Sequence, residues 1–117
     1  MRARQPAETY VKNLKRVSDA LGDSLLTPFL SNHDTGRTVG LVQGRQAPDR
    51  VKFAHALIAL MGGDTFTYYG EEIGMAGAGA DPNKRLGMLW DEDEVTDPPP
   101  GATSLEYPYP GVKAQLE

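Results

Sequence analysis

An aspartate and a histidine that adjoin in the sequence, Asp34 and His33, are the side chains of this chain best suited to chemistry. They follow Asn32 at the end of a short apolar run, residues 25–31, whose composition is typical of a buried parallel strand. At the carboxyl end of a strand, such side chains are held rigidly and face whatever lies above the sheet. The pattern favours binding and polarising a hydroxyl-rich ligand over packing a core.

The elements around these residues alternate between helix and strand. Helical spacing of apolar residues predicts an amphipathic helix over residues 7–21, ended by Gly22. A second helix, apolar almost all round and therefore expected between other elements, is predicted over residues 48–61. Residues 65–69 are β-branched and aromatic and predict a second strand. This order is typical of a parallel βα architecture.

Three other features of the sequence modify this scheme. Pro28 cannot donate to a ladder, so we expect local irregularity in the first strand, or pairing through one edge only. Residues 35–47 are rich in Gly, Arg, Gln and Thr and predict a loop. Residues 74–117 are predicted to be mostly irregular, which is long for a compact domain and typical of functional loops or of a part of something larger.

Composition excludes several classes of function. The formal net charge of −4, with scattered positive residues, disfavours a nucleic-acid groove. Cysteine is absent, so the chain has no disulfide, no thiol nucleophile and no thiolate metal site. No apolar run approaches the roughly 20 residues of a membrane helix. We therefore expect neither a nucleic acid nor a membrane as partner.

Three motifs, in order, resemble those of the α-amylase family of glycoside hydrolases. Residues 29–34 (FLSNHD), with Arg37 three positions on, are similar to the motif that ends barrel strand seven in that family. Residues 63–75 (GDTFTYYGEEIGM) are similar to its strand-eight motif. Residues 85–90 (RLGMLW) resemble the Arg-x-Pro-Met-x-Trp pattern of the following loop, with Gly87 in place of the proline. The motifs together cover roughly residues 25 to 90.

The resemblance implies an α/β fold that is a partial TIM (β/α)8 barrel. The chain would hold about the last two βα units, with strand seven near 25–31, helix 48–61 and strand eight near 65–69, followed by the irregular loop region 74–117. A whole barrel takes about 250 residues. At 117 residues, the chain is expected to be one fragment of a glycoside hydrolase catalytic barrel.

The resemblance also implies roles for four side chains. Asp34 is the catalytic carboxylate that binds sugar hydroxyls, distorts the ring and stabilises the oxocarbenium-like transition state, and His33 hydrogen-bonds the same sugar. Arg37 is expected to bind substrate or to hold Asp34 in a bidentate fork, the alternative being a solvated loop residue. Arg85 is expected to reach the sugar from its long loop, the alternative being a brace for that loop.

Other titratable residues receive a structural interpretation. Glu71 and Glu72 are consecutive and point to opposite faces of a strand, so they cannot converge on one bond, and Glu71 is expected to be buried and hydrogen-bonded. His55 is expected in the core. The acidic residues 91–94, and Asp81 with Asn83, lack the alternating ligands and tight-turn glycine of a calcium loop. We expect no metal site and no cofactor in this chain, while calcium elsewhere in a full-length protein stays open.

The resemblance implies part of a retaining α-glucan or oligosaccharide hydrolase, of the α-amylase or α-glucosidase type, whose partner is an α-linked glucose oligosaccharide or polysaccharide. Such an enzyme needs two carboxyls roughly 5 Å apart, and the family's nucleophile and acid/base motifs are absent from this sequence. We therefore expect the chain alone to be inactive and to need the rest of the parent barrel. The alternatives are a non-catalytic barrel relative that acts as a carbohydrate-binding or interaction module, and a free-standing small α/β protein that shares the motifs.

Overall fold

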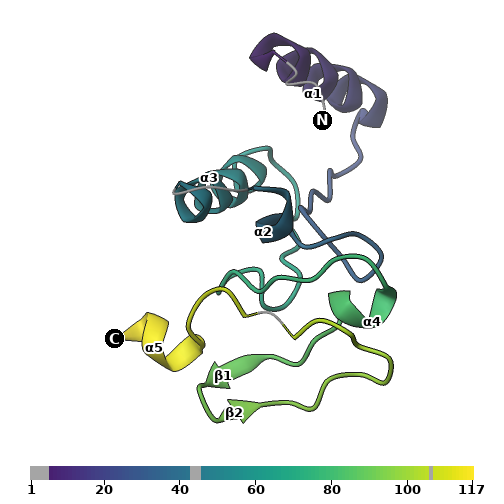
Figure 1. Ribbon diagram of the computed structural model, residues 1–117. Helices are drawn as coiled ribbons and strands as arrows, with labels where there is room; N and C mark the ends of the chain where they lie inside the picture. The colour runs from purple at the N-terminus through teal and green to yellow at the C-terminus, as the bar shows by residue number, and fades with distance from the viewer. Residues whose placement is uncertain (1–5, 43–45, 106) are drawn as a thin grey trace.

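The computed structural model describes residues 6–42, 46–105 and 107–117. The molecule measures 47 × 32 × 31 Å along its principal axes. Its elements are, in chain order, α1 (Ala7–Leu21), α2 (Thr38–Leu41), α3 (Ala47–Ala59), α4 (Asp81–Lys84), β1 (Leu89–Asp91), β2 (Glu94–Val95) and α5 (Val112–Leu116). Figure 1 shows α1 at one end, α2 and α3 in the middle, and the β1–β2 hairpin with α5 at the other end.

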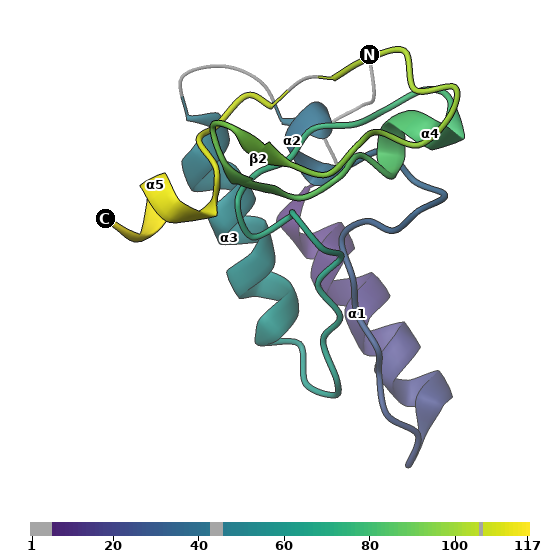
Figure 2. The same ribbon diagram turned by 90° about the horizontal axis from the view of Figure 1, so that it is seen from below.

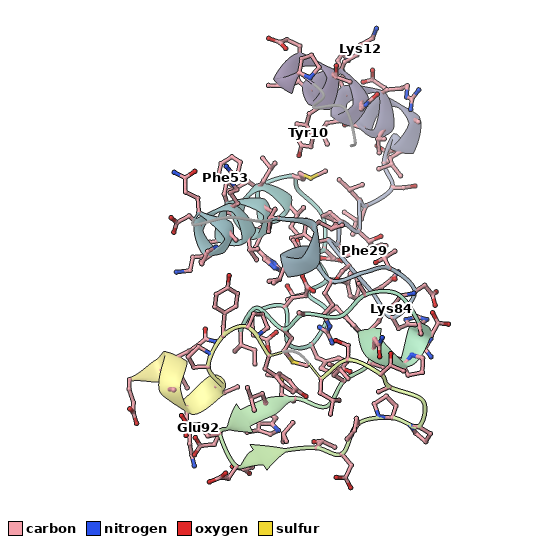
Figure 3. The ribbon with its side chains drawn as sticks, in the orientation of Figure 1. Tyr10, Lys12, Phe29, Phe53, Lys84 and Glu92 are labelled. Atoms are coloured by element: carbon pink, nitrogen blue, oxygen red, sulfur yellow. The ribbon has the colours of Figure 1, made fainter. Side chains whose placement is uncertain are left out.

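The two long helices present apolar faces that the described residues cover only in part. α1 spans the residues predicted for it, yet it buries none of its side chains. α3 buries Val51 and Ile58, whereas Phe53 lies on its outer side and Leu60 beyond its end is 85% exposed (Figure 3). An apolar groove of about 480 Å³ runs between the two helices. The expectation that α3 is enclosed between other elements is therefore wrong for the part of the chain that the structure describes.

The segments predicted as strands, residues 25–31 and 65–69, are extended neighbours that run alongside α1 and α3 (Figure 2), but neither forms a regular strand. Two backbone hydrogen bonds join them, from Asp64 N to Leu26 O and from Phe66 N to Pro28 O, each 2.9 Å long. A parallel ladder would place a returning bond between these two, donated by the N–H of residue 28, and proline has none. The prediction of two regular strands is thus corrected, and the irregularity expected from Pro28 is confirmed.

The strands that the structure does contain lie in the region predicted to be mostly irregular. β1 and β2 form an antiparallel hairpin with Leu89 opposite Val95, and α4 and α5 are single helical turns on either side of it. A small core lies beneath this region, made of Ile73, Met75 and Leu86 with partly buried neighbours. The loop predicted over residues 35–47 likewise contains the short helix α2. None of the helices that the structure describes is long and apolar enough to span a membrane.

Gly87 shows why this chain departs from the proline of the motif that it resembles. A Cβ atom at this position would lie 2.3 Å from the carbonyl oxygen of Thr96, which follows β2. The returning arm of the hairpin therefore passes too close to residue 87 for any side chain. Glycine at this position is therefore a packing requirement of the hairpin.

Gly62 and Gly63 offer a matched test of the contact between the two extended segments. Both have left-handed backbone, with φ of +81° and +82°, but a Cβ at Gly63 would lie 2.0 Å from Leu26 O, whereas one at Gly62 would meet nothing within 4 Å. Gly62→Ala should cost about 1–2 kcal/mol of unfolding free energy from backbone strain. Gly63→Ala should cost a further 1–3 kcal/mol or so, because it also forces the segments apart. Equal shifts in denaturant unfolding would contradict the pairing described here.

The attachment of α5 to the hairpin should depend on pH at both extremes. The ammonium group of Lys113 lies 2.9 Å from Asp91 Oδ2, and this hydrogen bond lowers the pKa of Asp91 below its ordinary value of 3.8. The same bond raises the pKa of Lys113 above 10.5. The stabilisation of α5 by Asp91 is lost as the pH falls below the ordinary pKa of an aspartate. The stabilisation by Lys113 is lost as the pH rises above the ordinary pKa of a lysine.

Amide hydrogen exchange of residues 112–116 should therefore be protected equally between about pH 4 and pH 10, after correction for intrinsic rates, and less outside that window. Because the pair is exposed, the effect should be small. Asp91→Asn should abolish the change on the acid side. Loss of protection near neutral pH in the unsubstituted protein, where Asp91 and Lys113 are both charged, would show that their ion pair does not hold α5.

Candidate functional site

The main chain at Asp34 is held by side chains on both sides of the Cα atom. Its N–H donates to Asn32 Oδ1 at 2.9 Å, and the same oxygen accepts the N–H of Thr35 at 3.0 Å, which closes an Asx turn. Its carbonyl oxygen accepts a hydrogen bond of 2.9 Å from Lys84 Nζ, fifty residues later in the chain. Asp34 therefore has a defined backbone orientation although it lies outside any helix or strand.

The carboxylate of Asp34 projects from this turn into solvent between two nitrogen-bearing side chains. His33 Nε2 lies 3.3 Å from Oδ2, and Arg85 Nη2 lies 3.7 Å from Oδ1. The Asp34 side chain is 66% exposed, and its two neighbours are also open to solvent. Three of the four side chains singled out in the sequence thus come together, with an anion flanked by two groups able to donate hydrogen bonds.

Arg37, the fourth of them, lies elsewhere. It is fully buried, its Nη1 donates to the carbonyl oxygen of Tyr69, and its guanidinium carbon lies 4.5 Å and 4.7 Å from the ring centroids of Tyr68 and Tyr69. Its ion-pair partner among the described residues is Glu71, at 3.9 Å, and not Asp34. The alternative of a solvated loop residue is therefore wrong, and the bidentate fork on Asp34 is not formed.

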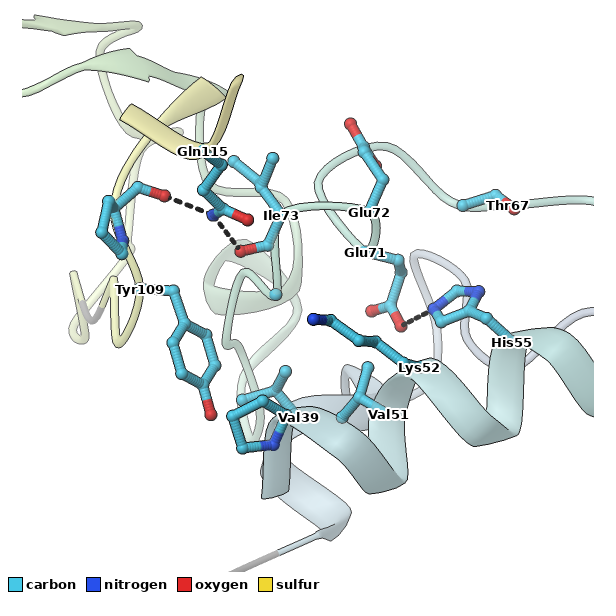
Figure 4. Close-up of a pocket in the computed structure, with 13 residues that line it drawn as sticks. Val39, Val51, Lys52, His55, Thr67, Glu71, Glu72, Ile73, Tyr109 and Gln115 are labelled. Carbon is cyan, nitrogen blue, oxygen red and sulfur yellow. Dashed lines mark hydrogen bonds and ion pairs between the residues drawn. The ribbon is translucent and has the colours of Figure 1, made fainter. Parts of the chain in front are cut away.

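Glu71 joins the turn that carries Asp34 to the segment that follows residue 69. Its buried carboxylate accepts the N–H of Thr38 at 3.3 Å and lies 3.8 Å from His55 Nε2 on α3 (Figure 4). The expectation that Glu71 is buried and hydrogen-bonded is confirmed, and Glu72 is exposed. Figure 4 also shows that Glu71 and His55 line a groove, of about 560 Å³, between α3 and the segment before α5.

The short helix α4, which carries Lys84 (Figure 3), supplies a second group of charges near Asp34. Lys84 Nζ lies 2.9 Å from Asp81 Oδ1, and Arg85 Nη2 lies 4.0 Å from Asp81 Oδ2. The hydrogen bond from Lys84 lowers the pKa of Asp81 below its ordinary value, so this carboxyl is ionised at neutral pH. Two carboxylates thus alternate with Lys84, Arg85 and the imidazole of His33.

Burial also affects the pKa of Tyr68, one of the two tyrosines that contact Arg37. Desolvation, followed by its neighbour Tyr69, raises the pKa of the Tyr68 hydroxyl above 10.0, so the phenol is neutral at physiological pH. The Tyr69 hydroxyl donates to the carbonyl oxygen of Leu86 at 2.7 Å, next to Arg85. The two rings therefore connect the buried Arg37 with the loop that bears Arg85.

Two residues of this site were not predicted from the sequence. Asn32 could have been, since an Asn two positions before Asp34 is a known signal for a side-chain-closed turn. Lys84 carries no local signal, because its bond to Asp34 spans fifty positions of chain. Among the residues that the structure describes, no group of three or more His, Cys, Asp or Glu side chains is placed to hold a metal ion.

Comparison with known proteins places this geometry in a family. The model of the alpha amylase catalytic domain matches residues 3–99. The alpha-amylase SusG of Bacteroides thetaiotaomicron is 39% identical over 93 residues, which are 78% of this chain and 13% of that protein. Neopullulanase 2 of Thermoactinomyces vulgaris is 42% identical over 66 residues, 56% of this chain and 11% of that protein.

A solved structure of similar sequence, Eubacterium rectale Amy13B, superposes with a TM-score of 0.87 at 38% identity. The match covers 97% of this chain and 24% of that one, as expected for part of a larger barrel. The chain spans only about a tenth to a seventh of the curated relatives that it matches. With the family model covering residues 3–99, the chain belongs to the alpha-amylase catalytic domain family.

Proposed function

We propose that this chain is the part of a retaining α-glucan hydrolase that presents Asp34 to the sugar at the scissile bond. The observation that carries the proposal is the contrast between the backbone and side chain of Asp34. Its N–H and carbonyl are both bound by side chains, while its carboxylate remains 66% exposed between His33 and Arg85. A carboxylate that only capped a turn would direct its own oxygens at the backbone, and here Asn32 does so instead.

Asp34 acts on the transition state of glycoside cleavage. That state resembles an oxocarbenium ion, and hydrogen bonds to sugar hydroxyls that strengthen as it forms contribute several kcal/mol. A fixed anion costs no reorganisation at the moment of reaction. His33 and Arg85, which flank the Asp34 carboxylate, donate to the same sugar. The nucleophile and the acid/base residue come from other parts of the protein, so the chain alone has no hydrolase activity.

The substrate class follows from the family and from the names of the relatives. An alpha-amylase, a neopullulanase and a cyclomaltodextrinase share the matched segment with this chain. These names support an α-linked glucose oligosaccharide or polysaccharide as the substrate. The exposed mixture of carboxylate, guanidinium and imidazole at Asp34 suits such a ligand, because each sugar hydroxyl both donates and accepts hydrogen bonds.

Arg37 is a positioning residue that lies buried below the turn that carries Asp34. It is too deeply buried to touch a sugar, and it connects the Asp34 turn with Tyr68, Tyr69 and Glu71. Its backbone N–H donates to Gly77 O at 2.9 Å, which also joins the turn to the loop that leads into α4. The substrate-binding role first expected for Arg37 is replaced by this one.

Substitution of Asp34 tests the proposal in the full-length protein that contains this chain. Asp34→Asn should lower kcat on a maltooligosaccharide about a thousandfold, the equivalent of several kcal/mol of transition-state stabilisation, with little change in thermal stability. Asp93→Asn is the matched control, because it makes the same chemical change at an exposed carboxylate in the turn between β1 and β2. Asp34→Asn activity similar to that of the control would refute the proposal.

Substitution of Arg37 distinguishes a positioning role from contact with substrate. Arg37→Met leaves the buried Glu71 carboxylate without its guanidinium partner, which should cost about 3–5 kcal/mol of stability. The double substitution Arg37→Met/Glu71→Gln removes the uncompensated charge and should recover part of that loss in chemical denaturation. If Arg37→Met instead kept full stability and raised KM alone, Arg37 would be a substrate ligand.

A further inference from the structure

Two hydrogen bonds attach the turn that carries Asp34 to the segment of residues 77–85. At one end, the N–H of Arg37 donates to Gly77 O at 2.9 Å. At the other, Lys84 Nζ donates to Asp34 O, also at 2.9 Å. The first of these bonds joins two backbone groups. The second is donated by the side chain of Lys84 and is accepted by Asp34 itself. Removing that side chain would leave the peptide between Asp34 and Thr35 held only through the Thr35 N–H, which Asn32 binds.

We propose that Lys84 is a positioning residue for the Asp34 carboxylate, acting through the carbonyl oxygen of Asp34. The inference rests on the proposed function of Asp34 and adds a residue that neither the motifs nor the family comparison assigns. Lys84 binds the carbonyl oxygen of Asp34, whereas Asn32 Oδ1 accepts the N–H groups of Asp34 and Thr35. With both groups bound, the main chain is held on either side of the Asp34 Cα, and this fixes the direction of the side chain.

Lys84 is well held for this task. Its side chain is only 11% exposed although lysine is ordinarily solvated, and its ammonium group also lies 2.9 Å from Asp81 Oδ1. Asp81 and Lys84 are the first and last residues of α4, so their ion pair spans this single turn of helix. The lysine therefore has one preferred position in which it bridges a carboxylate and the Asp34 carbonyl.

The helix that carries Lys84 is itself fastened to the loop that follows the hairpin. Asn83 is buried, and its Oδ1 accepts the N–H of Thr103 at 2.8 Å and of Ser104 at 3.2 Å. Its Nδ2 donates to Thr103 Oγ1 at 3.1 Å and to Ala78 O at 3.3 Å. The amide group thus uses its donors and its acceptor in fixing α4, and Lys84 extends from a rigid base.

Lys84 affects turnover through the orientation of the Asp34 carboxylate. A displacement of about 1 Å at a reacting centre lowers a rate by roughly a hundredfold, even when the displaced group remains chemically intact. Loss of the Lys84 bond leaves the Asp34 carbonyl in solvent, where water can satisfy it, so the change should cost little stability. The consequence should therefore appear in turnover more than in folding.

The experiment compares two lysines in the full-length protein. Lys84 and Lys113 each lie 2.9 Å from an aspartate oxygen, but only Lys84 also binds Asp34. Lys84→Met should lower kcat on a maltooligosaccharide about 10- to 100-fold while KM changes less than about threefold. Lys113→Met should leave both unchanged, and the two variants should melt at similar temperatures. Lys84→Arg, which keeps a charged donor, should restore most of the turnover.

A double substitution separates this inference from the proposed function. If Lys84 acts through Asp34, Lys84→Met should have no further effect in an Asp34→Asn background. A full additional loss there would overturn the inference, as would unchanged kcat in Lys84→Met or a loss explained by unfolding alone. Normal turnover by Asp34→Asn itself would instead refute the proposed function. The two failures therefore give different results.

Discussion

The direction of the catalytic carboxylate depends on how the main chain at Asp34 is held in place outside any regular element. Pro28 deprives the two paired extended segments of a ladder hydrogen bond, so no regular sheet leads up to Asp34 in the part of the chain that the structure describes. Two side chains replace the ladder, with Asn32 on the N–H and Lys84 on the carbonyl. An exposed carboxylate can then keep one direction, which is the property that binding to a developing positive charge requires.

A second layer of buried charge lies under this turn. Arg37 and Glu71 are both buried, and each is satisfied only in part by partners in its surroundings: the Tyr69 carbonyl and two aromatic rings for the first, the Thr38 N–H for the second. Such an arrangement adds little net stability, but breaking it exposes an uncompensated charge. Its effect is to fix the distance between the Asp34 turn and the segment after residue 69. The buried Arg37–Glu71 pair thus fixes the position of the Asp34 turn.

The sequence predicted α1 and the adjacency of His33 and Asp34 well, because both rest on local patterns. Helical spacing over residues 7–21 and the FLSNHD motif need no information about distant segments. The hairpin β1–β2 could not be predicted in the same way, since its strands are three and two residues long and lie in a Pro- and acid-rich region. Arg37 was placed wrongly because an arginine three positions after an aspartate says nothing about Tyr68 and Tyr69, which enclose it. Lys84 was missed for the same reason, its partner being fifty positions away.

We propose that the Asp34 carboxylate faces a sugar while Asn32 binds the Asp34 N–H and Lys84 binds the Asp34 carbonyl. A crystal structure of the full-length protein with a bound maltooligosaccharide tests it most directly. We expect both Asp34 oxygens within about 3 Å of hydroxyls on one glucose unit, with Lys84 still on the Asp34 carbonyl. A sugar bound away from Asp34, or a carboxylate turned toward its own backbone, would contradict the account.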